Sequence, residues 1–197
     1  MDIRYIVMGA SLAVSVLMLL GKLAAYFLTG SAAIMADASE SIVHLAATGF
    51  AAFSLWYSLR PADDCHPYGH GRISFFSAGF EGALVFVASF AVIGSALYEL
   101  YQGPELRDIG VGLAITCVLA VVNLALGVTL VSVGRRSNSI VLIANGKHVL
   151  TDVYTTAAAI VGLVLVLATG KQILDPLAAI AIGFLIMAGG FSLLRSA

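Results

Sequence analysis

Long hydrophobic segments alternate with short polar breaks along the whole chain. A helix needs roughly 20 apolar residues to cross about 30 Å of hydrocarbon. Runs of that kind cover residues 5–28, 32–59, 73–101, 109–133, 140–167 and 175–194. The breaks between them hold glycine, proline and charged residues. The pattern predicts an all-α membrane protein, a six-transmembrane-helix bundle that forms a single domain over residues 1–197.

Sequence signals at the helix ends support this division. Asp108 precedes the fourth run as an expected N-cap, and Asp175 followed by Pro176 has the same expected role at the start of the sixth. The first run is too long for the hydrophobic part of a cleaved signal peptide, so we interpret it as a membrane span.

Composition narrows the class of protein further. Of the 197 residues, 60% are hydrophobic and 11% are charged, and the mean hydropathy is +1.02. Soluble domains average about 45–50% apolar and about 25% charged residues, so this composition is that of a membrane protein. The net charge of -1 gives no basic surface for nucleic acid. Cys65 and Cys117 form no C-x-x-C motif, and no disulfide framework follows from them.

The distribution of basic residues predicts the orientation of the bundle. With six spans, both termini lie on one side of the membrane. That side holds Arg4, Arg60, Arg72, Arg135, Arg136, Lys147 and Arg195. The opposite side holds Arg107 and Lys171, and we expect Lys22 to extend from the first span toward that face. The positive-inside rule therefore places both termini in the cytoplasm, with the chain in a cell (inner) membrane.

Four ionisable side chains occur in pairs inside two of the predicted spans. Glu40 and His44 are four residues apart, as are His148 and Asp152. This spacing puts each pair on one face of its helix, and two such helices facing each other would bring four ligands together. Imidazole and carboxylate ligands suit a borderline-soft divalent ion such as zinc. Alternatively, the two pairs are buried hydrogen bonds that only hold helices together.

The loop after the second span holds another group of ligand-type residues. Asp63, His66 and His70 have the spacing D-x-x-H-x-x-x-H, with Asp64 as a substitute or supporting ligand and Cys65 between them. All four histidines of the chain fall in this loop or in the two intramembrane pairs. A second metal site is therefore one interpretation of the loop, and a solvated polar loop is the other.

Further polar and small residues lie within the predicted spans. Asp37 either supports Glu40 or lines a pathway, and Glu81 either lines a pathway or pairs with a neighbouring helix. We expect Asn123 to form an interhelical hydrogen bond. Small residues of the third span favour close helix approach, within the chain or across a dimer: Gly79, Gly82, Ala83 and Gly94.

Three segments resemble motifs of the cation diffusion facilitator family of proton-coupled divalent-metal exporters. They are residues 35–44, the loop at 61–71, and residues 148–152. They occur in the same order and at similar spacings as that family's second-helix, loop and fifth-helix motifs. The pair Glu40 and His44 stands where well-known zinc members have Asp-x-x-x-Asp or His-x-x-x-Asp.

The resemblance implies a site, partners and a mechanism. Glu40, His44, His148 and Asp152 match the family's transport site, and the loop-site positions correspond to Asp63, His66 and His70. It also implies a homodimer, no prosthetic group, zinc as cargo and protons as counter-ion. The family's C-terminal cytoplasmic domain is expected to be missing, because the sixth run ends three residues before the end of the sequence.

The expected function is therefore export of a divalent metal, most simply Zn²⁺, in exchange for protons, and not an enzymatic reaction. Members that prefer Cd²⁺, Co²⁺, Fe²⁺ or Mn²⁺ are the main alternative, since carboxylate and imidazole serve these ions also. A non-transporting membrane subunit and an intramembrane metallohydrolase are the remaining alternatives. The sequence has no H-E-x-x-H motif for the latter.

Overall fold

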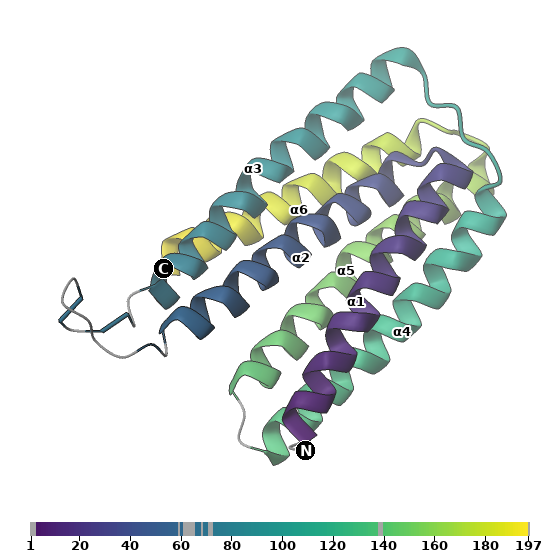
Figure 1. Ribbon diagram of the computed structural model, residues 1–197. Helices are drawn as coiled ribbons and strands as arrows, with labels where there is room; N and C mark the ends of the chain where they lie inside the picture. Colours follow the sequence, from purple (N-terminus) through teal and green to yellow (C-terminus); the bar gives the residue numbers. More distant parts are fainter. Residues whose placement is uncertain are drawn as a thin grey trace.

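The structure is a bundle of six α-helices, shown as a computed structural model in Figure 1. It describes residues 3–58, 60, 66, 67, 69, 70, 73–137 and 140–196, and this part of the chain contains no strand. The helices are α1 (Ile3–Thr29), α2 (Ala32–Ser58), α3 (Ile73–Gln102), α4 (Ile109–Arg136), α5 (Ile140–Thr169) and α6 (Leu174–Ser196). The six-helix fold expected from the hydrophobic pattern is confirmed.

Five of these helices are long and apolar enough, over their described residues, to cross a membrane. The exception by this measure is α2, which has the same 27-residue length as α1 but carries Asp37 and Glu40. Its neighbours are α1, α3, α5 and α6, so it lies among the other helices. Polar side chains on an enclosed helix can be satisfied by protein partners rather than lipid.

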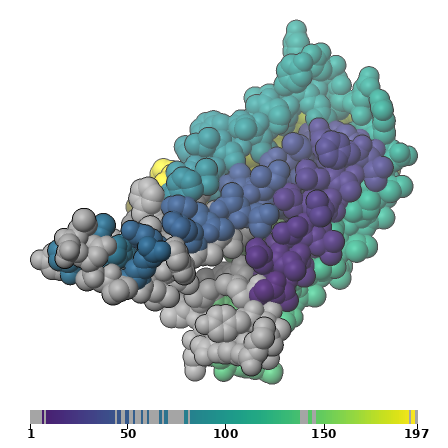
Figure 2. Space-filling model, viewed as in Figure 1, coloured from purple at the N-terminus to yellow at the C-terminus, as the bar shows by residue number. Residues whose placement is uncertain are grey.

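The helices pack in two groups of three. The most extensive contacts join α3 to α6 and α4 to α5, followed by α2 to α3 and α1 to α4. One group is thus α2, α3 and α6, and the other is α1, α4 and α5. In Figure 1 the two groups converge at the end that holds the α1–α2 and α5–α6 turns, and diverge toward the end where both termini lie. Figure 2 shows α1 and α2 forming a continuous surface at the converging end.

The core at the converging end consists mainly of small residues. Its buried side chains come from α2, α3, α5 and α6: Ala32, Ala33, Ala36, Val92, Ala96, Ala159, Ala179, Ile182 and Ile186. Small side chains let helix backbones approach closely, which is the usual basis of helix association in membranes. On α2, residues 32–34 and 36–38 are buried, whereas Ile42 and Phe53 farther along are exposed.

The first residues of α4 and α6 differ from the expected capping pattern. Asp108 occupies the N-cap position of α4, but its side chain makes no capping hydrogen bond. It is exposed, so water can satisfy the first N–H groups of that helix. Asp175 lies inside the first turn of α6 and accepts hydrogen bonds from Ser31 and Ala32, so it caps α2 instead of its own helix. The buried N-terminus of α2 has no access to water, which makes the carboxylate of the neighbouring helix its partner.

Candidate functional site

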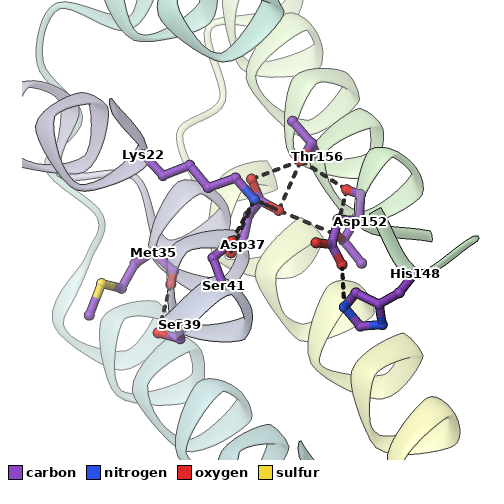
Figure 3. A network of polar contacts seen from close by, with 9 residues as sticks. Lys22, Met35, Asp37, Ser39, Ser41, His148, Asp152 and Thr156 are labelled. Atoms are coloured by element: carbon purple, nitrogen blue, oxygen red, sulfur yellow. Dashed lines mark hydrogen bonds and ion pairs between the residues drawn. The ribbon is translucent and has the colours of Figure 1, made fainter. Parts of the chain in front are cut away.

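The described part of the candidate site brings together two ligand-type residues of α5. His148 Nε2 lies 3.3 Å from Asp152 Oδ1, one helical turn away (Figure 3). Asp152 is 8% exposed, and His148 is half-buried. A carboxylate held in the bundle beside an imidazole is the donor pair that a borderline divalent cation takes.

Glu40 extends the site from α5 to α2. Its Oε2 atom is buried and has no hydrogen-bond partner among the described residues. The Glu40 carboxyl interacts electrostatically with Asp152 and with Asp37, so acidic groups of both helices lie near one another. A buried acceptor without a donor is costly in a bundle, and a cation satisfies it. Glu40 also borders a small cleft whose other walls are Val43, Val85, Ala88, Val92 and Ile186.

The fourth expected ligand, His44, follows Glu40 by one turn of α2, but its side chain lies outside the described residues. Among the side chains that are described, no three of the His, Cys, Asp and Glu type form a metal-binding group. The four-ligand site therefore stays a prediction. The side chain of Glu81, on α3, also lies outside the described part of the structure.

A polar network that was not predicted from the sequence lies beside this site. Lys22 Nζ of α1 lies 2.9 Å from Asp37 Oδ1 of α2 and donates to Ser41 Oγ at 2.8 Å. Thr156 of α5 donates to both Asp37 oxygens at 3.0 Å (Figure 3). Thr155 donates to Asp37 Oδ1 at 3.2 Å. Three helices thus meet at the Asp37 carboxylate.

The expectation that Lys22 reaches the membrane surface is wrong. Its side chain is 2% exposed and is paired with Asp37, which is 1% exposed. An unpaired ammonium group must find water, whereas a carboxylate and a hydroxyl nearby satisfy it inside the bundle. The sequence holds a signal for this pair. Lys22 lies eight residues before Gly30, and Asp37 lies seven after it, so two antiparallel helices joined at that glycine place both at equal depth.

The loop between α2 and α3 brings two histidines together. The ring centroids of His66 and His70 are 4.5 Å apart, and the His70 ring lies edge-on to Tyr57 at 4.7 Å. Gly69 adopts φ +77, a conformation that favours glycine, and its N–H donates to the His66 carbonyl. The third expected ligand, Asp63, lies outside the described residues, as do Asp64 and Cys65, so the loop metal site stays a prediction.

The chain is similar to known membrane transporters over almost its whole length. The family model of the cation efflux transmembrane domain matches residues 8–197. The chain is 38% identical over 174 residues to the uncharacterized transporter sll1263 of Synechocystis sp., covering 88% of this chain and 56% of that relative. It is 32% identical over 178 residues to the cation-efflux pump FieF of Serratia proteamaculans, covering 90% and 59%. It is also 32% identical over 171 residues to the magnetosome protein MamB of Paramagnetospirillum magneticum, covering 85% and 56%. The chain therefore spans somewhat more than half the length of these relatives.

Proposed function

Because this chain belongs to the cation diffusion facilitator family of metal cation efflux transporters, we propose that it carries a divalent metal ion across the membrane between α2 and α5. The observation that carries the proposal is the pairing of the buried Asp152 with the half-buried His148 on α5. The carboxyl group of Glu40 on α2, whose buried Oε2 has no hydrogen-bond partner among the described residues, interacts electrostatically with Asp152. Such groups are costly inside a membrane unless they have a function.

The division of the helices into two groups gives the site a means of opening and closing. Glu40 belongs to the group α2, α3 and α6, whereas His148 and Asp152 belong to the group α1, α4 and α5. Movement of one group against the other changes the distance between these ligands and their access to either side. This arrangement supports alternating access, in which rigid groups rock around a site at their interface.

Zinc is the proposed cargo, and protons are the proposed counter-ion. Metal binding requires ionised carboxylates and neutral imidazoles, so protons compete with the metal for the same ligands. A proton gradient can then drive release on the side away from the cytoplasm. Cd²⁺, Co²⁺, Fe²⁺ and Mn²⁺ compete for such a donor set, and the exchange of glutamate and histidine for the ligands usual in zinc members bears on the preference among them.

The proposed working unit is a homodimer in the inner membrane, with both termini in the cytoplasm. The loop histidines then lie at the cytoplasmic mouth of the pathway, where they would collect metal ions before transport. Cross-linking of the reconstituted chain in lipid tests the dimer separately from transport.

Metal-stimulated proton flux in proteoliposomes tests the proposal. We expect Zn²⁺ to drive proton movement through the parent protein and the variants His148→Ala and Asp152→Asn to abolish it. Asp108→Asn is the matched control for Asp152→Asn, because Asp108 undergoes the same change at an exposed position outside the site. Undiminished flux in both site variants would refute the assignment.

A further inference from the structure

The Lys22–Asp37 ion pair is positioned between the candidate site and the end of the bundle away from the termini. We propose that this pair, with Thr155 and Thr156, is a gate that closes the metal pathway on that side, and that a cation at Glu40 and Asp152 opens it. The inference rests on the proposed function, which supplies the cation. We refer to these four residues as the gate.

Helix direction places the gate on one side of the site. α2 starts at the end away from the termini, and Asp37 precedes Glu40 on it by one turn. α5 runs in the opposite direction, and Thr156 follows Asp152 by one turn. Asp37 and Thr156 therefore both lie one turn from the ligands in the direction of the α1–α2 turn. The gate spans α2 and α5 at the level directly beyond the ligands.

Packing shows that the bundle is closed at and beyond the gate. Lys22 and Asp37 are 2% and 1% exposed, and Thr156 is fully buried. One turn farther from the termini, Ala33 of α2 and Ala159 of α5 are both 0% exposed and share one core cluster. In the opposite direction, the two helix groups diverge (Figure 1). The structure is thus closed on the gate side, and passage toward that side requires α2 and α5 to separate there.

Charge gives the site a means of acting on the gate. The Lys22 ammonium interacts electrostatically with both Glu40 and Asp152, in addition to its ion pair with Asp37. A divalent cation on those two carboxylates repels the ammonium across a region with little water, where screening is weak. The repulsion loosens Lys22 of α1 from Asp37 of α2, and the hydrogen bonds from Thr155 and Thr156 of α5 are then the remaining contacts between the Asp37 carboxylate and its neighbouring helices.

An ion pair that only holds helices together differs from a gate in its effect on access. In both cases removing Lys22 would lower stability, because breaking a buried ion pair leaves an uncompensated charge. Only a gate exposes the residues packed between α2 and α5 beyond it in a metal-dependent way, because its opening separates these two helices there. Ala159 offers a position to measure this access, since cysteine is a small replacement for alanine and the residue lies beyond the gate.

Thiol labelling of the full chain in proteoliposomes provides the test. The reporter is Ala159→Cys in a chain whose own two cysteines, Cys65 and Cys117, are replaced by alanine. A membrane-impermeant maleimide and EDTA are present outside, so that molecules with their termini in the lumen expose the gate side to the reagent. We expect slow labelling that accelerates when Zn²⁺ is sealed in the lumen. Lys22→Met should label at least about fivefold faster without metal, the lower end of usual coupling between sites, and should lose the response to Zn²⁺.

Matched variants separate the gate from general damage. Lys171→Met makes the same change at an exposed lysine on the same end of the bundle and should label like the parent. Thr156→Val keeps the ion pair and removes the hydroxyl, so it should label at an intermediate rate even if Lys22→Met does not fold. Parent-like labelling by folded Lys22→Met and Thr156→Val would overturn the gate. Failure of the proposed function appears separately, as absent Zn²⁺ transport by the parent protein.

Discussion

Asp175 of α6 caps the N-terminus of α2 through Ser31. Asp175 Oδ1 accepts a hydrogen bond of 2.6 Å from Ser31 Oγ, and Oδ2 accepts one of 2.6 Å from the Ala32 backbone N–H. The side chains of Ser31 and Asp175 are both 0% exposed. The carboxylate thus satisfies N–H groups that α2 cannot pair internally, and its negative charge suits the positive end of the helix dipole. This contact joins two helices of one group, so α2 and α6 are expected to move together.

We predict that Asp175→Asn destabilises the fold by about 1–3 kcal/mol, because the amide replaces one acceptor oxygen with a donor and leaves a buried group unsatisfied. Denaturant unfolding of the purified protein in detergent micelles measures the change. Asp108→Asn makes the same substitution at an N-cap that has no side-chain hydrogen bond, and it should leave stability unchanged. Equal stability of the two variants would contradict the capping role of Asp175.

Two adjacent glycines of α6 provide a test of the packing of α6 against α3. A Cβ atom on Gly190 would lie 2.7 Å from the Phe86 backbone nitrogen and 3.1 Å from the Gly82 carbonyl, whereas one on Gly189 would have no heavy atom within 4 Å. Gly190→Ala should therefore cost about 1–3 kcal/mol through overpacking. Gly189→Ala should not lower the free energy of unfolding, since alanine is the better helix former. Unfolding of both variants under the same conditions makes the comparison.

The loop histidines are expected to hold a metal ion of their own. His66→Ala should lower the bound-zinc stoichiometry measured by calorimetry by one ion per chain, and His70→Ala should do the same. Replacing His70 also removes its ring contact with Tyr57, so His66→Ala, at an exposed position, is the cleaner variant. Unaltered stoichiometry in both would favour a solvated polar loop. Zinc transport should fall less in these variants than in Asp152→Asn.

The helices themselves follow from local properties of the sequence. The apolar runs, with glycine, proline and charged residues between them, predicted the positions of all six helices. The largest difference at a helix end is in α4, which ends at Arg136 instead of residue 133. The two arginines at its end are compatible with helix because they reach solvent. The partner of Asp175 could not be predicted in this way. Its role depends on α6 packing against α2, across 144 positions of sequence separation for Ser31.

The candidate site was predictable only to the extent that it depends on spacing within one helix. His148 and Asp152 are four positions apart, which by itself places them one turn apart on a helix. The meeting of Lys22 with Asp37 depends instead on how α1 and α2 pair. A lysine in a hydrophobic run favours the membrane surface when considered alone, and only its antiparallel neighbour provides a buried counter-charge.

Zinc uptake into sealed proteoliposomes by the parent protein and Glu40→Gln tests the central claim most directly. Glu105→Gln is the control, because it is the same substitution at an exposed residue in the connection between α3 and α4. The account predicts uptake by the parent and by Glu105→Gln, and uptake by Glu40→Gln at the level of protein-free vesicles, because zinc loses its α2 carboxylate. Parent-level uptake by Glu40→Gln would contradict a transport site between α2 and α5.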